Sequence, residues 1–593
     1  MANILPEGKS QFVDGNGKPY AGGFVYFYIP STTTPKNTWQ DAAQTILNTQ
    51  PIVLDGDGRA IIFGSGAYRQ QLYDVNNNLI WDQLTYSSLA ATDLSATGVP
   101  GGAGLIGFDG NTLAQQFQNR VERVCTNIAA LRAIAKTTYS YAFVEGYYTQ
   151  GDGGGGSYWY DSTDTTSADN GGTIIVASDG GRWKLASISA PLDIRVFGAK
   201  SDGVMDIGGI LNTMLGLKIQ PLIPYSSTAW IINTTVTIAK NNWIEFEDPS
   251  VKINSTATAI FRILGNPNEV IEPCGLRGGA VFDMTGSIAG SSVILMGTSS
   301  QNVASVRILG RYMAKNCYSF YLEETSASNF VLDVQIEDVY CQYTKGRQFY
   351  SKRSRGFFLV RSFAVDHTAN TYVTNWEGIR VEDFIGFEGE RLDVVGPIPA
   401  NLSPVYQSAA NSMVFAGVGG GQASLFLTRA LADNTYGNGI IIDTVLNVEC
   451  GMISAYQNLG FGIQINNCTN VQVSRIEVVG AVGVTGASAG QHGLALNNCD
   501  QLQLNNVVSN ANTSDGVLVH NTTHGVYTNV TTRSNSNIGW AEDGTSNLNV
   551  KIGLLSYSNT SSSLVQVGAN SATCNWIPNS GTFTSSTVGP ATV

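Results

Sequence analysis

The chain has 593 residues, more than one ordinary globular domain contains, so several modules or one long repetitive module are expected. Only 13% of the residues are charged and 66 are glycine, which favours an extended β architecture with many turns. The net charge of −12 argues against nucleic acid as the main partner, because phosphate binding needs clustered Lys and Arg.

The eight cysteines are scattered, with no CxxC pair and no Cys/His cluster, so neither a disulfide scaffold nor a metal or cofactor site is expected. No apolar run approaches the roughly 18 residues that a membrane span needs. The first residues lack the basic and apolar regions of a secretory signal. We therefore expect synthesis in a cytoplasm and no membrane span.

Residues 1–87 are predicted to form a small β domain. Turn signals at 15–17 and 76–78 separate short alternating runs, and residues 24–29 are typical of a strand buried on both faces. A segment rich in Gly, Ala and Thr follows, and residues 88–140 are interpreted as a linker and a helical neck.

One helix is predicted over residues 111–136. Its apolar residues are spaced 4, 3, 4 and 3 apart, as in a heptad seam: Phe117, Val121, Val124, Ile128 and Leu131. We favour a short oligomeric neck, and the alternative is a helix that docks on its own chain. Residues 141–190 are rich in Gly and aromatic residues and predict a second small β module, in which the four glycines at 153–156 form tight turns.

A repeat begins near residue 430. The repeated glycines are spaced 23, 31, 23 and 23 residues apart, so one repeat carries an eight-residue insertion around 483–490: Gly439, Gly462, Gly493, Gly516 and Gly539. Apolar residues stand one and three positions after each glycine, with Glu542 as the exception. An earlier pair, Gly356 and Gly378, lies 22 residues apart and aligns Leu359 with Val381.

A period near 23 with period-2 alternation predicts short strands, one coil of a parallel β-helix for each repeat. Asn467, Asn498 and Asn521 stand five positions after their glycines and are expected to stack at a turn, where their amides bond to one another. The β-helix is predicted over 191–555, and residues 556–593 are expected to form a cap or a trimer contact.

Three segments resemble phage tailspike proteins. GGFVYFYIPSTTTPKNTWQDAAQT, from Gly22, resembles their virion-binding head domain. IAALRAIAKTTYSYAFVEGYYTQGDGGGGSYWYD is similar to a module that often precedes the catalytic β-helix. LDIRVFGAKSDGVMD, residues 192–206, resembles the opening motif of pectate-lyase-like β-helices, although Ser201 replaces a glycine. The third motif marks a fold superfamily and does not specify a reaction.

The resemblance implies an all-β protein with a right-handed parallel β-helix, small N-terminal β domains and a homotrimeric state. It implies attachment to the phage virion or tail protein through the N-terminal domain. It also implies a bacterial surface polysaccharide as ligand: O-antigen, capsule or exopolysaccharide. Many such proteins are endoglycosidases, some are lyases and a few remove acetyl groups. The protein is then made in the host cytoplasm, carried in the virion and active at the bacterial surface.

Glycoside hydrolysis needs two carboxyl groups, and the densest acidic region of the predicted β-helix is residues 377–393. Ile379 and Val381 fit inward positions, so neighbouring charged residues should face outward. We predict that the catalytic pair lies within this pool: Glu382, Glu388, Glu390 and Asp393. Asp433 and Asp443 are secondary acidic candidates.

The predicted substrate-binding residues surround the acidic pool: Arg380, Arg391, Trp376, Tyr372 and Asp366. The aromatic residues could stack on sugar rings, and burial in the core is the alternative. The two arginines keep a lyase open, because proton abstraction beside a uronate carboxylate needs a base and a cation. An adhesin with the same fold and no cleavage remains a further alternative.

Overall fold

The computed structural model describes the chain apart from 21 short segments: 1–2, 5–8, 87–101, 109, 121–122, 137, 266–272, 287, 298–301, 324–328, 356–357, 367–375, 397–410, 418–422, 436, 482–490, 544, 567–570, 575–576, 579–582 and 586–593. Contacts divide it into two units. The first is Met1–Arg123 with Thr137–Tyr141, and the second is Val124–Lys136 with Ala142–Val593. None of the described helices is long and apolar enough to cross a membrane.

The first unit contains a four-stranded antiparallel sheet in the order β4 (Ile52–Val53), β3 (Phe24–Tyr28), β7 (Ala67–Tyr73), β8 (Leu79–Tyr86). The predicted strand near residue 24 is therefore confirmed. The prediction that this strand is buried on both faces is wrong, because Val25 and Phe27 are buried in the core whereas the alternate residues are half-buried. Only one face of this sheet packs on the buried core of the domain.

The prediction of one helix over 111–136 is wrong. The segment contains two short helices, α2 (Leu113–Arg120) and α3 (Ile128–Arg132), with strand β11 (Arg123–Cys125) between them. Ile128 and Leu131 of the predicted seam are buried in the chain's own fold. The Asn127 side chain caps α3 by accepting a hydrogen bond from the Ala130 amide, which starts a new helix there. Ile128 and Leu131 therefore dock on the same chain, whereas Val124 is exposed.

The second unit begins with a small β module. Its five-stranded sheet has the order β11, β12 (Tyr141–Val144), β13 (Gly156–Tyr160), β15 (Arg182–Leu185), β14 (Ile174–Val176). In the predicted tight turn, Gly153 has a φ of +85° and a Cβ there would lie 2.3 Å from the Arg195 guanidinium carbon, so only glycine fits.

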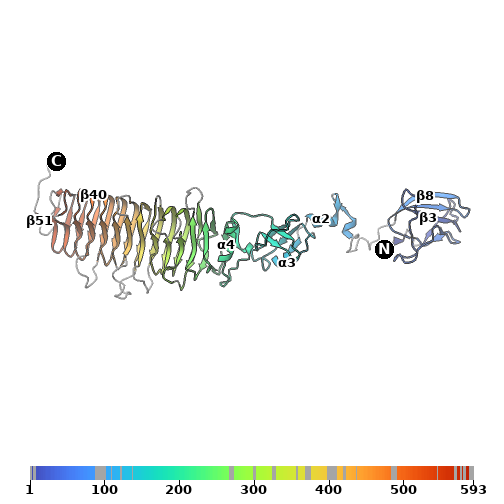
Figure 1. The fold of residues 1–593 in the computed structure, drawn as a ribbon, viewed down its shortest axis with the longest axis horizontal. Helices are drawn as coiled ribbons and strands as arrows, with labels where there is room; N and C mark the ends of the chain where they lie inside the picture. Colours follow the sequence, from blue (N-terminus) through green and yellow to red (C-terminus); the bar gives the residue numbers. More distant parts are fainter. Residues whose placement is uncertain are drawn as a thin grey trace. The chain divides into compact units, whose positions relative to one another are not determined.

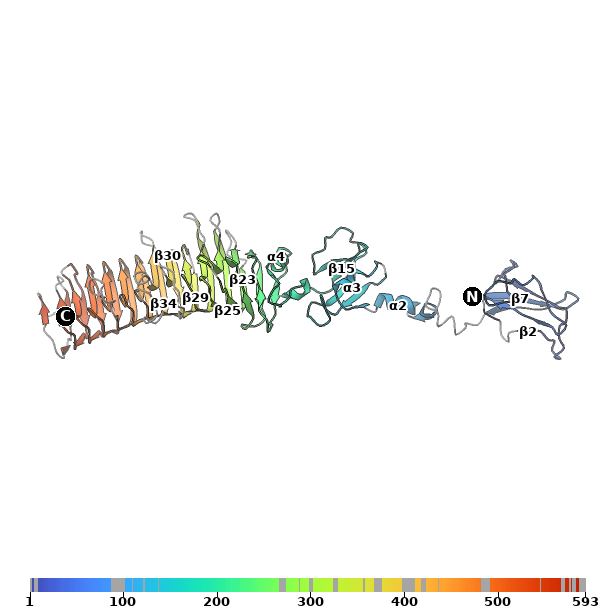
Figure 2. The ribbon, with the colours of Figure 1, turned by 90° about the horizontal axis from the view of Figure 1, so that it is seen from below.

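A parallel β-helix follows, as predicted, and its strands stack side by side from α4 (Gly208–Gly216) to β51 (Phe583–Ser585) (Figure 1). Its described strands form a 22-stranded parallel sheet, from β16 (Leu192–Asp193) to β50 (Ile577–Pro578), and a 14-stranded parallel sheet, from β19 (Val236–Ala239) to β51. Figure 2 shows β25, β29 and β34 in succession along one side, with β30 on another side.

The central strands carry the predicted site. Those of the 22-stranded sheet are β23 (Cys274–Asp283), β25 (Val303–Lys315), β27 (Val331–Gln342), β29 (Phe358–Asp366), β31 (Gly386–Gly389), β32 (Leu392–Val395), β34 (Ser424–Asp433) and β36 (Asn447–Tyr456). Those of the 14-stranded sheet are β28 (Phe349–Ser351), β30 (Glu377–Phe384), β33 (Asn411–Gly417) and β35 (Ile440–Asp443).

The repeat after residue 430 is confirmed strand by strand. The residues that follow the repeated glycines align in one register column: Ile440, Ile463, Leu494, Val517 and Trp540. The predicted asparagine ladder is present, because Asn498 Nδ2 donates to Asn467 Oδ1 and Asn521 Nδ2 donates to Asn498 Oδ1, both over 3.1 Å. The predicted insertion at 483–490 lies outside the described residues.

The prediction that Gly356 and Gly378 begin two equivalent repeats is wrong. Leu359 lies on β29 of the 22-stranded sheet, whereas Val381 lies on β30 of the 14-stranded sheet and pairs with Ser351. Coil lengths vary in this part of the solenoid, so a 22-residue spacing links positions on two different sheets.

Candidate functional site

The predicted acidic pool is divided between the two sheets. Glu382 and Arg380 lie on β30, whereas Glu388 and Asp393 lie on β31 and β32. The pool is therefore no single cluster, although 377–393 is continuous in sequence. A parallel β-helix turns a corner within each coil, and this segment turns one between residues 384 and 386.

Glu382 belongs to a closed polar network on the 14-stranded sheet. It accepts hydrogen bonds from the Tyr350 hydroxyl and from Arg380 Nε, the latter over 2.8 Å. Arg380 also contacts the buried Glu377, with 2.7 Å between Nη1 and Oε1. Burial raises the pKa of Glu382, but the bonds from Tyr350 and Arg380 outweigh it, so its pKa lies below the usual value. Glu382 is thus ionised and already satisfied by its own chain.

Glu388 and Glu390 face outward on the 22-stranded sheet. Glu390 forms an ion pair with Arg361 over 3.0 Å and its side chain is 44% exposed. Glu388 aligns with Leu359 and has no ion pair among the described residues. Both fit the solvated charged face that is the ordinary state of such residues.

Trp376 cannot stack on a sugar, so this prediction is wrong. Its side chain is 1% exposed and lies in the core of the solenoid. Of the other predicted binding residues, Tyr372 lies outside the described residues. Asp366 ends β29 in register with Val395, but its side chain is also outside the described part of the chain.

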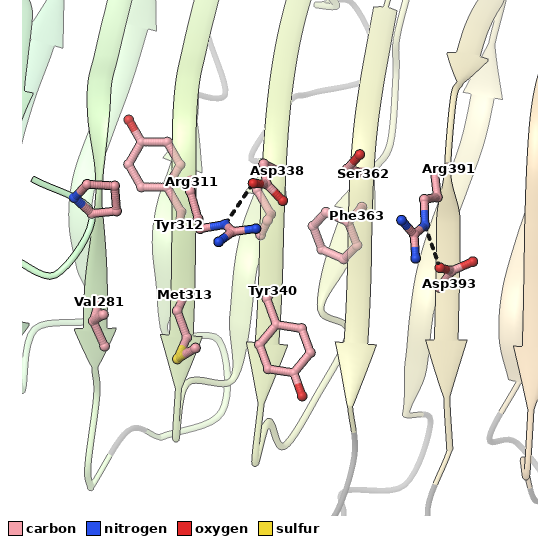
Figure 3. Close-up of a pocket in the computed structure, with 12 residues that line it drawn as sticks. Val281, Arg311, Tyr312, Met313, Asp338, Tyr340, Ser362, Phe363, Arg391 and Asp393 are labelled. Carbon is pink, nitrogen blue, oxygen red and sulfur yellow. Dashed lines mark hydrogen bonds and ion pairs between the residues drawn. The ribbon is translucent and has the colours of Figure 1, made fainter.

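A groove of about 380 Å³ crosses the outer face of β25, β27, β29 and β32 (Figure 3). Two ion pairs line it, and each holds an arginine Nε 2.9 Å from a carboxylate oxygen: Arg311 with Asp338, and Arg391 with Asp393. The structure therefore brings together Arg391 and Asp393, which the sequence predicted, with Arg311 and Asp338, which it did not. No spacing reveals Asp338, because the loops between the coils differ in length.

Asp393 stands out among these carboxylates. Its side chain is only 15% exposed although it faces outward, and Oδ1 accepts no hydrogen bond within the described part of the chain. Arg429 Nε lies 3.7 Å from Oδ1. A buried carboxylate oxygen normally has a hydrogen-bond donor. Asp393 Oδ1 is therefore an exception: it is covered by the surrounding chain and has no hydrogen-bond donor among the described residues.

Asp433 lies on the neighbouring coil. The register pairs Asp393 with Leu431 and Val395 with Asp433, so the two aspartates occupy diagonal positions on one outer face. Strand spacing of about 4.8 Å and about 6.6 Å for two residues place their Cα atoms roughly 8 Å apart. Burial raises the pKa of Asp433 above its usual value. Asp443, the other secondary candidate, accepts hydrogen bonds from Thr444 and Asn467 on the 14-stranded sheet.

Comparison with known proteins identifies one segment. Residues 124–187 match the family described as phage tail protein small four-stranded beta-sheet domain. The segment resembles a phage tail domain. This match and the parallel β-helix together confirm the predicted resemblance to tailspike proteins. No curated protein matches the chain.

Several solved structures are similar. The tailspike of Acinetobacter baumannii phage AM24 is 15% identical, with a TM-score of 0.37 over 72% of this chain and 68% of that chain. The tailspike of Acinetobacter phage vB_ApiP_P1 is 14% identical, with a TM-score of 0.39 over 72% and 71%. Pantoea stewartii WceF, described as a glycan biofilm modifying enzyme with a tailspike-like fold, is 11% identical, with a TM-score of 0.31 over 88% and 64%. Scores this low carry no argument about a site or reaction.

Proposed function

We propose that the chain is a phage tailspike that binds a bacterial surface polysaccharide and cleaves it by hydrolysis at Asp393 and Asp433. The phage tail segment at 124–187 supports a place in the virion tail. The diagonal placement of the two aspartates on one outer face carries the enzymatic part of the proposal.

The separation of the two aspartates fits hydrolysis with inversion. In inverting glycosidases, the two carboxyl groups lie about 6.5–9.5 Å apart, which leaves room for a water beside the sugar. Both side chains project from the same face, and the spacing of roughly 8 Å between their Cα atoms is compatible with this range.

The two environments suit two roles. Val395 and Leu431 are the register partners of Asp433 and Asp393, so apolar side chains flank both carboxyl groups. Burial favours the protonated form of Asp433. Asp433 can therefore donate a proton to the leaving glycosidic oxygen. Asp393 is held by Arg391 and Arg429, and its carboxylate would accept a proton from the attacking water.

The groove supplies a binding surface beside this pair. Apart from Pro249 and Arg391, its lining residues lie on β23, β25, β27, β29 and β32, with Asp393 at the β32 end (Figure 3). Five neighbouring strands about 4.8 Å apart span roughly 19 Å, so a polysaccharide bound there would cross the strands along the solenoid. Tyr340, Arg311 and Arg391 provide an aromatic ring and two guanidinium groups for sugar contacts.

The assembly is part of the same proposal. We infer a homotrimer that is attached to the virion through residues 1–87, on the resemblance of the head-like segment from Gly22.

Incubation of the purified chain with capsule, O-antigen and exopolysaccharide from the bacteria to which it adsorbs tests the proposed reaction. Chain length, reducing ends and unsaturated-uronate absorbance would be followed together. Shorter chains with new reducing ends and no rise in absorbance are expected. A rise in absorbance would instead establish a lyase, and binding without shortening would establish an adhesin.

A further inference from the structure

A second pocket, of about 390 Å³, lies where the small β module meets the first coils of the β-helix, far along the chain from the groove. The module contributes Tyr147, Tyr148, Thr149 and Asp152. The motif at 192–206 contributes Arg195, Lys200 and Asp202 to the other wall, and the coil after it contributes Tyr225.

The small β module and the motif at 192–206 pack closely against each other beside the pocket. Gly198 has a φ of +81°, and a Cβ there would lie 2.7 Å from the Tyr147 ring, so glycine is required. The Tyr148 hydroxyl donates to the Gly198 carbonyl over 3.0 Å. Asp152 accepts hydrogen bonds from four backbone amides, including those of Tyr147 and Tyr148. The pocket is thus formed before any ligand arrives.

Of the two cations that line the pocket, only Lys200 forms no ion pair among the described residues. Arg195 is paired with Asp193, with 2.6 Å between Nη2 and Oδ2. Asp202 accepts hydrogen bonds from two amides of its own turn. The Lys200 ammonium lies 3.7 Å from the centre of the Tyr148 ring, forms no ion pair with a carboxylate among the described residues, and interacts electrostatically with Asp202. The attraction between the Lys200 ammonium and the Tyr148 ring holds this positive charge beside the pocket.

We propose that this pocket binds an acidic sugar residue of the polysaccharide, at a site separate from the cleavage groove. The Lys200 ammonium would pair with the sugar carboxylate. Tyr225, which is 54% exposed, would stack on the sugar ring, and its loop is held because its amide donates to Glu247 over 2.7 Å. The inference rests on the proposed function only in taking the ligand to be a glycan.

The test is a titration of the full chain with D-glucuronic acid, N-acetylneuraminic acid and methyl α-glucoside, followed by ligand-observed NMR. Wild type, Lys200→Gln, Tyr225→Ala and the control Lys252→Gln would be compared, because Lys252 is an exposed lysine outside the pocket. Binding of at least one acidic sugar is expected. Loss of the charge should weaken it about tenfold in Lys200→Gln, with no change in the control.

Equal binding of acidic sugars by wild type and Lys200→Gln, or preference for the neutral glucoside, would overturn the inference, as would the absence of acidic-sugar binding by wild type. Cleavage of polysaccharide by the same preparations separates the two proposals. Cleavage without acidic-sugar binding would overturn the pocket alone, and binding lost in Lys200→Gln without any cleavage would overturn the hydrolase alone.

Discussion

Asp393 and Asp433 lie diagonally on adjacent coils, with Val395 and Leu431 at the other two corners of the square. Burial raises the pKa of Asp433, whereas Asp393 is held by two arginines and keeps one carboxylate oxygen without a hydrogen bond among the described residues. Two carboxyl groups in unlike environments are what acid–base hydrolysis of a glycosidic bond requires.

Replacement of the acid should abolish most of the activity. Asp433→Asn keeps the size of the side chain but cannot donate a proton, so we expect kcat to fall by roughly 10² to 10⁴ in a reducing-end assay. Glu449→Gln is the matched control, because Glu449 is an exposed carboxylate on the next strand, β36. Equal loss in both variants would show that Asp433 has no specific role.

Activity should depend on pH through the same residue. Asp433 must be protonated to act, so the rate should fall as the pH rises through its raised pKa. The folded state favours the protonated form, so the stability that Asp433 contributes is present below the unfolded pKa of about 3.9 and is lost as the pH rises through the folded pKa. At neutral pH, Asp433→Asn should therefore be at least as stable as wild type in urea unfolding. A clear loss of stability would contradict this assignment.

Trp376 should prove structural. Its side chain is 1% exposed, so Trp376→Ala is expected to lower the free energy of unfolding by about 3–5 kcal/mol through the cavity that it leaves. Urea unfolding would measure the loss, and Trp376→Phe should show a smaller one. Unchanged stability with weaker polysaccharide binding would return Trp376 to the binding site.

A buried ion pair should control the stability of the last coils. Lys551 Nζ lies 2.6 Å from Glu542 Oε2, and both side chains are 0% exposed. Burial lowers the pKa of Lys551, and Glu542 offsets this only in part. Lys551→Met should destabilise the protein by about 3–5 kcal/mol, because it leaves a carboxylate buried and unpaired. The double variant Lys551→Met, Glu542→Gln should recover much of the loss in thermal unfolding, and no recovery would contradict the pairing.

The sequence predicted the fold where its coils have equal length. From Gly439 onward, a constant spacing places apolar residues and asparagines in the columns that the structure shows. Glu542 stands at a position that is apolar in the other repeats, and Lys551 neutralises its charge inside the solenoid. The repeat pattern does not predict this lysine, which lies on β46 (Val550–Ile552). Near residue 380 the loops vary, so alternation alone could not reveal the corner that separates Glu382 from Glu388.

The candidate site was predictable only in part, because the coils that form it differ in length. Arg391 and Asp393 are close in sequence, and the structure places them in the groove. Asp338 and Arg311 reach that groove from earlier coils, and no sequence period connects them to it. Trp376 was misassigned because an aromatic residue beside a strand has the same local pattern whether its ring faces the core or the solvent.

The most direct test of the central claim compares binding and cleavage of one polysaccharide by wild type and Asp393→Asn. The substitution removes the proton-accepting carboxylate while keeping the shape of the groove. We expect wild type to shorten the chains and to release reducing ends, and Asp393→Asn to bind the same polysaccharide with its length unchanged. Cleavage by Asp393→Asn at the wild-type rate would contradict the account and place the reaction elsewhere on the molecule.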